Sequence, residues 1–123
     1  MNGIRLLCDT NTLIHLLRNN RTVVEFLIGK QIHISAITEL ELFGKQNMSE
    51  REISITEIMI ENCFVFDLIE PIKQIVKKLR WKYKIKLPDA IVAATAIYLD
   101  IPLLTYDSDF KNIEEIKLIL FKI

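Results

Sequence analysis

Short apolar segments alternate with helical sequence along the whole chain, and this alternation restricts the fold more than any other feature. Each helix in such a pattern carries the chain back to the edge where the next strand begins, so the strands run parallel. Strands are expected at residues 4–8, 31–35, 63–68, 103–105 and 116–121. Helices are expected at 12–19, 22–28, 36–45, from the Ser49 cap to 61, from Pro71 onward and at 88–99, with a turn or single helical turn at 107–112. The sequence therefore predicts an α/β fold in which helices cover both faces of a parallel sheet.

Length and composition indicate one compact domain. The 123 residues, half of them hydrophobic, suffice for one core, so we expect a single domain over 1–123 without a linker. Lysine plus arginine equal aspartate plus glutamate at 16 each, so any contact with a polyanion must be local. The longest apolar run, 90–99, is too short to cross a bilayer and no signal-type segment is present, which indicates a cytoplasmic protein. Cys8 and Cys63 fall in apolar segments and are expected to be inert, buried thiols.

The segment from Leu6 to Ile14 contains the first candidate functional residue. Its apolar residues run into Asp9, a polar Thr-Asn-Thr follows, and leucine and isoleucine then recur at helical spacing. Asp9 is therefore expected at the carboxyl end of a strand, where ligands bind in open α/β sheets. The alternative is that Asp9 only caps the following helix, for which Thr10 and Asn11 are further candidates.

Other carboxylates fall at equivalent places in the chain. They are Glu39 and Glu41 after the second strand, Asp89 at the start of the buried helix, and Asp107 and Asp109 after the fourth strand. Carboxylates that converge repel one another, whereas a divalent cation makes the cluster favourable. An all-oxygen ligand set is typical of Mg²⁺ or Mn²⁺ and not of zinc, and such an ion promotes hydrolysis of phosphate esters. Each acid also has a simpler possible role, since Asp89 could merely stabilise its helix dipole.

Four segments carry a resemblance to a known family. They are Asp9-Thr10-Asn11, Ile34 to Leu42, Lys86 to Ala96 and Leu103 to Phe110. In this order and spacing they resemble the PIN-domain ribonucleases and, more narrowly, the VapC toxins of type II toxin-antitoxin pairs. The resemblance covers nearly the whole chain and implies a Rossmann-like, PIN-type sheet with an acidic pocket for Mg²⁺ or Mn²⁺. It also implies an endoribonuclease that cleaves RNA with metal-activated water, a homodimer, and a VapB-like antitoxin as partner.

The resemblance assigns the site residue by residue. The catalytic and metal-binding acids are then Asp9, Glu41, Asp89 and Asp107, with Asn11 and Thr105 as supporting polar residues. Glu39 and Glu41 both flank the apolar side of one helix, so helical geometry does not separate them and the resemblance alone favours Glu41. Asp107 lies two residues after Thr105, as the family pattern requires, while Asp109 could replace it or support it.

Two further features have simpler interpretations. His15 and His33 have no cysteine or histidine partner at ligand spacing, so solvated or structural roles are expected. The basic run from Lys77 to Lys86 surrounds Trp81, and it is either a solvated helix face or a surface for RNA or a partner protein.

Four rival functions share parts of this pattern. A phosphoacceptor or a phosphatase would also place Asp9 at a strand end, but a phosphatase of the haloacid dehalogenase type requires a second aspartate where Asn11 stands. A non-catalytic PIN-like module that binds RNA or protein is the main alternative, although bare carboxylates would hinder binding of a polyanion. A deoxyribonuclease on the same fold also fits the composition.

Overall fold

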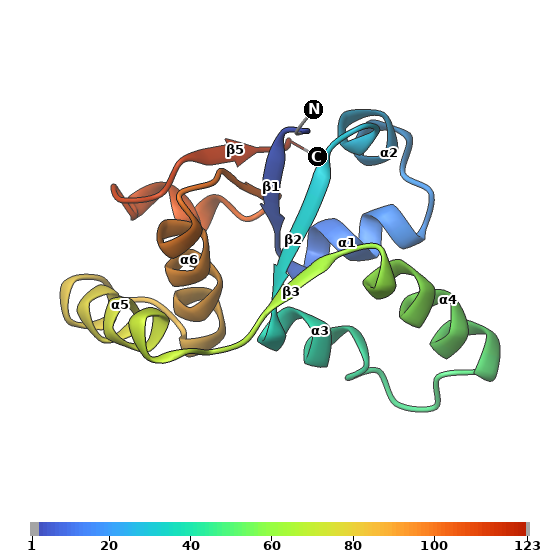
Figure 1. The fold of residues 1–123 in the computed structure, drawn as a ribbon, viewed down its shortest axis with the longest axis horizontal. Coiled ribbons are helices and arrows are strands. Elements are labelled where there is room, and N and C mark those ends of the chain that lie inside the picture. Colours follow the sequence, from blue (N-terminus) through green and yellow to red (C-terminus); the bar gives the residue numbers. More distant parts are fainter. Residues whose placement is uncertain (1–2, 123) are drawn as a thin grey trace.

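The computed structural model describes residues 3–122 and contains a five-stranded sheet in which all neighbouring strands are parallel (Figure 1). Its strands are β1 (Arg5–Cys8), β2 (Gln31–Ser35), β3 (Phe64–Phe66), β4 (Leu103–Thr105) and β5 (Leu118–Leu120). The helices are α1 (Thr10–Leu17), α2 (Arg21–Leu27), α3 (Ala36–Leu42), α4 (Glu50–Glu61), α5 (Glu70–Lys82), α6 (Leu87–Leu99) and the 3-10 helix η1 (Ser108–Asn112). The order β3-β2-β1-β4-β5 places β1 in the centre. The predicted α/β fold is confirmed.

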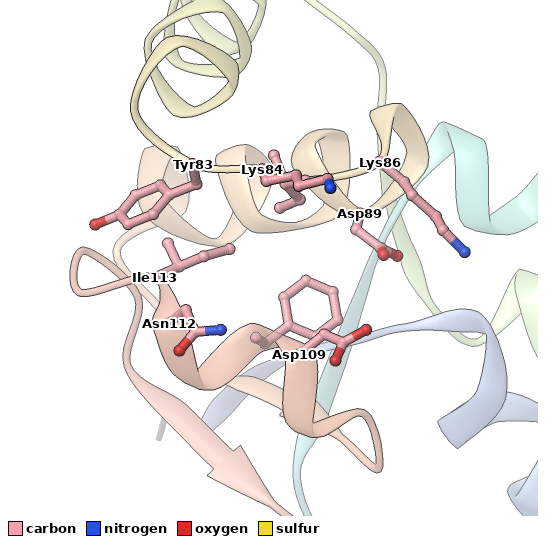
Figure 2. A pocket seen from close by; sticks show the side chains of 9 residues that line it. Tyr83, Lys84, Lys86, Asp89, Asp109, Asn112 and Ile113 are labelled. Carbon is pink, nitrogen blue, oxygen red and sulfur yellow. The ribbon is translucent and has the colours of Figure 1, made fainter.

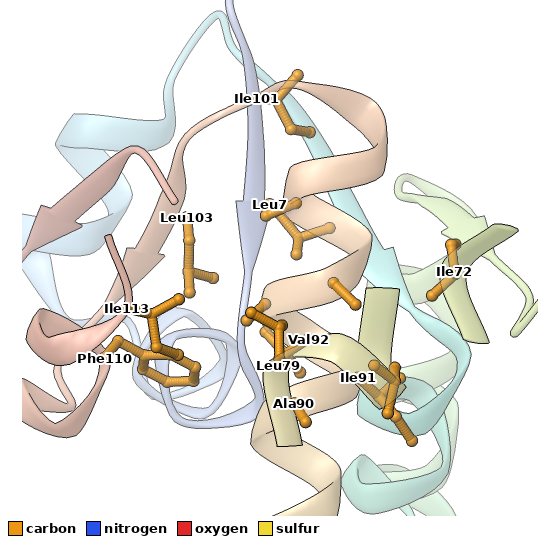
Figure 3. Packing of buried hydrophobic residues seen from close by; sticks show 14 residues of the cluster. Leu7, Ile72, Leu79, Ala90, Ile91, Val92, Ile101, Leu103, Phe110 and Ile113 are labelled. Carbon is orange, nitrogen blue, oxygen red and sulfur yellow. The ribbon is translucent and has the colours of Figure 1, made fainter. Parts of the chain in front are cut away.

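The central strand β1 contributes side chains to both faces of the sheet, because successive residues of a strand point in opposite directions. Leu7 packs into a cluster with residues of α5 and α6 (Figure 3), whereas Leu6 and Cys8 pack into a second cluster with residues of α1 and α2. Helix α6 is buried throughout residues 90–96 and contacts α5, α3 and β2. These contacts on several sides explain why its sequence is apolar almost all round.

Several element boundaries differ from the sequence prediction. Helix α1 begins at Thr10, two residues early, because Asp9 itself is the N-cap. Helix α3 ends at Leu42 and not at 45, because the amides of Phe43 and Gly44 bond to carbonyls only three residues back and tighten the last turn. The expected strands 63–68 and 116–121 shorten to β3 and β5, of three residues each, since only these residues pair with β2 and β4. The capping box at Ser49 and Glu52 is confirmed.

Both cysteines are free thiols within the apolar layers. Burial raises the pKa of the Cys8 thiol far above its usual range, and burial raises the pKa of Cys63 to about 11. Both groups therefore stay protonated at neutral pH, as expected for residues that only pack. Over residues 3–122, no helix combines the length and apolar character that a membrane span requires.

The carboxyl ends of β1 and β4 lie side by side at the centre of the sheet. The chain leaves β1 to form β2 on one side and returns much later to form β4 on the other. These two ends therefore flank the position where the strand order reverses, which is the usual ligand-binding position in open α/β sheets. The register pairs Cys8 with Leu104, so Asp9 comes next to Thr105.

Candidate functional site

Asp9 is the N-cap of α1, and three hydrogen bonds hold its carboxylate. Oδ1 accepts from the backbone N and the Oγ1 of Thr12, at 3.0 and 2.8 Å. Oδ2 accepts from the hydroxyl of Thr105, on β4. Only 8% of the residue is exposed. Capping and a site role are therefore compatible, because the cap uses Oδ1 while Oδ2 is directed toward the end of β4.

Thr105 connects the two strand ends. Its hydroxyl donates to Asp9 and accepts from the backbone N of Asp107, at 2.9 Å. The Asp107 carboxylate in turn accepts from the backbone N of Asp109, also at 2.9 Å, and thereby caps η1. One hydroxyl thus fixes the carboxylate of Asp9 and the backbone at Asp107.

Thr105→Val is expected to lower the free energy of unfolding by about 1–3 kcal/mol, because Thr105 is fully buried and the variant removes the partner of the Asp107 amide and of Asp9 Oδ2, while the bonds from Thr12 to Oδ1 remain. Thr95→Val is the matched control. Thr95 is equally buried, but its hydroxyl only adds a bond to a carbonyl four residues back in α6. Urea denaturation measures both variants, and equal losses would show that Thr105 has no special linking role.

Asp89 lies in the first turn of α6, behind Pro88. Partial burial raises the pKa of its carboxyl above the usual range, and the charges of Asp107, Asp9 and Glu41 raise it further, while Lys86 opposes the shift. These three neighbours come from the segments after β1, β2 and β4. Three of the acids assigned by resemblance therefore act on the fourth, Asp89, whereas Glu39 and Asp109 are not among the groups that shift its pKa.

Glu41 is exposed near the end of α3, and its Oε1 accepts from the Thr10 hydroxyl at 2.5 Å. This bond connects α3 to the first residue of α1, next to Asp9. Asn11 follows as the second, exposed residue of α1. Glu39, two residues before Glu41, is half-buried.

The acids share one region without meeting at one point. Within residues 3–122, no three histidine, cysteine, aspartate or glutamate side chains are arranged so that they could hold a metal ion. The oxygens of Asp9 are engaged by Thr12 and Thr105, and an oxygen of Glu41 is engaged by Thr10. Each of these carboxylates accepts a hydrogen bond from a hydroxyl or an amide within the protein.

A cavity of about 580 Å³ adjoins Asp89, and no pattern in the sequence predicted it. It lies between the connection from α5 to α6 and the 3-10 helix η1, and Asp109 and Asn112 line the η1 side (Figure 2). Asn112 carried no recognisable signal in the sequence, because nothing local places η1 opposite the start of α6.

The two histidines and the tryptophan, which were not assigned to the site, have structural or surface positions. His33 is buried, its ring stacks on Phe64 at 4.8 Å, and burial lowers its pKa, so its role is structural. His15 packs on Tyr106, with 4.3 Å between ring centroids. Trp81 is 80% exposed on α5, which is consistent with either interpretation of the basic run.

Comparison with known proteins identifies the fold family. The family model described as PIN domain matches residues 6–116. A toxin-antitoxin complex from Klebsiella pneumoniae contains a chain that is 30% identical, with 96% of this chain and 99% of that chain covered and a TM-score of 0.83. VapBC-1 from nontypeable Haemophilus influenzae is 25% identical over 95% and 98% of the two chains, with a TM-score of 0.78.

A third structure shares the fold at lower identity. VapC20 from Mycobacterium tuberculosis, a sarcin-ricin loop cleaving toxin, is 14% identical over 91% of this chain and 98% of that one, with a TM-score of 0.69. Comparison with curated protein sequences gives no match. Because the PIN model spans nearly all of the sequence and the sheet has the same architecture as these structures, the chain belongs to the PIN domain family.

Proposed function

We propose that this protein is a metal-dependent endoribonuclease that hydrolyses RNA phosphodiester bonds, and that it is the toxin of a type II toxin-antitoxin pair. The observation that carries the proposal is the electrostatic cluster around Asp89. Hydrogen bonds through Thr105 and Thr10 hold Asp9, the backbone at Asp107 and Glu41 around the position where the strand order reverses, and burial first, with the charges of these three acids after it, raises the pKa of Asp89. A structural role alone gives no reason to gather like charges there, whereas a site for a divalent cation requires it.

Mg²⁺ or Mn²⁺ fits the donors present, since the cluster consists of carboxylates and carries excess negative charge. When bound, the ion supplies an activated water and neutralises charge on the phosphodiester. Asp9, Glu41, Asp89 and Asp107 are the residues that would hold it. Thr12 and Thr105 fix the orientation of Asp9, while the exposed Glu41 can exchange its bond with Thr10 for a ligand.

Similar proteins support the choice of substrate and partner. VapC20 cleaves the sarcin-ricin loop, and the Klebsiella and Haemophilus structures are toxin-antitoxin complexes. We therefore assign RNA as the substrate and a VapB-like antitoxin as the partner protein, and we expect a homodimer as the resemblance implies. The non-catalytic RNA- or protein-binding module remains the rival function, and it differs by predicting binding without cleavage.

The proposal is tested with purified protein, single-stranded RNA and DNA of the same sequence, and either Mn²⁺ or EDTA. Cleavage of RNA alone, in Mn²⁺ alone, is expected. The matched pairs Glu41→Gln with Glu39→Gln, and Asp107→Asn with Asp109→Asn, identify the acids. The first member of each pair should lose far more activity, because its charge belongs to the cluster that acts on Asp89.

Each outcome of this experiment has a separate meaning. A reversed order within a pair would reassign that ligand without changing the reaction class. RNA binding without cleavage in any divalent ion would favour the non-catalytic module, and cleavage of DNA would contradict the proposed substrate.

A further inference from the structure

The cavity beside Asp89 has apolar side chains in its lining. Phe110 and Ile113 line it and are 2% and 5% exposed, because both are anchored in the cluster under α6. Ile85 lines it from the α5–α6 connection and packs against the same cluster. The volume of about 580 Å³ falls in the range of preformed ligand pockets, roughly 300–1,000 Å³. Because Phe110 and Ile113 are almost fully buried, they form the floor of the cavity, and the half-buried Ile85 is the apolar side chain with more surface free to contact a flat group.

A polar group is available at the far side of the cavity from Asp89. Asn112 ends η1, and Figure 2 shows its side-chain amide directed toward the cavity, across from the α5–α6 connection. Its side chain makes no hydrogen bond to another residue within 3–122. An asparagine amide offers both donors and an acceptor, which is the combination that reads the edge of a nucleobase.

Two lysines line the side of the cavity formed by the α5–α6 connection. Lys84 and Lys86 line the cavity from the α5–α6 connection, and neither is in an ion pair within the described residues. Figure 2 shows Lys86 beside Asp89, so its ammonium group is close to the acidic cluster. Cations at the mouth of an apolar cavity suit a ligand that carries a phosphate next to its flat group.

We infer that this cavity binds one unstacked base of the RNA substrate, next to the phosphate that is cleaved, and that Asn112 determines which base is accepted. Single-stranded RNA is recognised in this way, by bases that leave the stack, pack on apolar side chains and present their edges to polar groups. The inference rests on the proposed function, and it names the part of the chain that confers sequence preference.

The first test needs no catalysis and separates the inference from the proposed function. The full chain is titrated in EDTA with each of the four nucleoside 5′-monophosphates, and NMR follows the methyl groups of Ile85 and Ile113. We expect these signals to shift more with one base than with the others, and Asn112→Ala to remove the difference. Gln46→Ala is the control, because it deletes an exposed amide from the α3–α4 loop.

The second test uses cleavage of a pool of random single-stranded RNA in Mn²⁺, with sequencing of the new ends. Asn112→Ala should reduce the preference at one position beside the cleaved bond by roughly 5- to 150-fold, which is the usual effect of one good contact to a base edge. The cleavage rate of the preferred sequences and that of the unpreferred sequences should become similar in this variant. Gln46→Ala should keep the wild-type preference.

Two results would overturn the inference. One is the absence of nucleotide-dependent shifts at Ile85 and Ile113, and the other is a base preference that Asn112→Ala leaves unchanged. Failure of the wild type to cleave RNA, together with base-dependent shifts in the cavity, would reject the proposed function and leave the base site standing.

Discussion

Replacing Asp9 by asparagine is expected to abolish measurable RNA cleavage, with a loss of several orders of magnitude, while the fold is kept. Asparagine is as good an N-cap as aspartate, so its oxygen can still accept the two bonds from Thr12 that begin α1. What disappears is the negative charge and the second carboxylate oxygen, so the bond from the Thr105 hydroxyl is lost together with the means to hold a divalent cation and the water that it activates. The variant therefore separates the capping role of Asp9 from its proposed catalytic role.

The measurement is the cleavage rate of labelled single-stranded RNA in Mn²⁺, accompanied by circular dichroism and thermal unfolding of the variant. Asp89→Asn should behave in the same way, since the two acids belong to one cluster. Either variant, purified in parallel, also controls for a contaminating ribonuclease. Full activity in Asp9→Asn would disprove the mechanism.

The second large expected effect is that Mn²⁺ raises the thermal stability of the protein. Without the ion, the clustered acids repel one another more in the folded protein than in the expanded unfolded chain, so Mn²⁺ should stabilise the fold. At a free concentration about 100 times its dissociation constant, an ion that binds only the native state adds about 2.7 kcal/mol. For a domain of this size that is an increase of several degrees in the melting temperature. Calorimetry of the wild type in EDTA and in Mn²⁺ measures it.

Asp89→Asn should have opposite effects in the two conditions. The raised pKa of Asp89 means that its ionised form is disfavoured in the folded state, so a neutral amide should raise the melting temperature in EDTA. The same amide is a poor ligand for a hard cation, so the increase caused by Mn²⁺ should shrink or vanish. A wild-type melting temperature that is unaffected by Mn²⁺, at concentrations that support cleavage, would show that these acids do not form the ion site.

The order and type of the elements were predictable because they depend on neighbours in the sequence. The apolar run of α6 and the capping box at Ser49 and Glu52 are local patterns, and the structure confirms both. Strand lengths were less predictable, since β3 and β5 extend only as far as their partners β2 and β4 provide hydrogen bonds. The end of α3 also escaped prediction, because its last turn tightens into bonds of shorter span.

In the candidate site, too, some features were predictable from local sequence and others depend on the folded chain. The sequence placed Asp9 at a strand end and offered two glutamates on one helix, which helical geometry could not separate. The folded chain distinguishes them, because Glu41 lies against Thr10 and contributes to the field at Asp89. Its assignment as a ligand stays a prediction until the paired variants are measured.

By itself, the sequence determined the alternation of strands and helices, the caps and the presence of acids after the strands, since each depends on residues only a few positions apart. Tertiary structure alone decided that the Thr105 hydroxyl meets Asp9, 96 positions away, and that η1 closes a cavity against the α5–α6 connection. Such encounters follow from strand order and register. These are set by packing of the whole sheet between its two apolar layers, and no local pattern of residues encodes them.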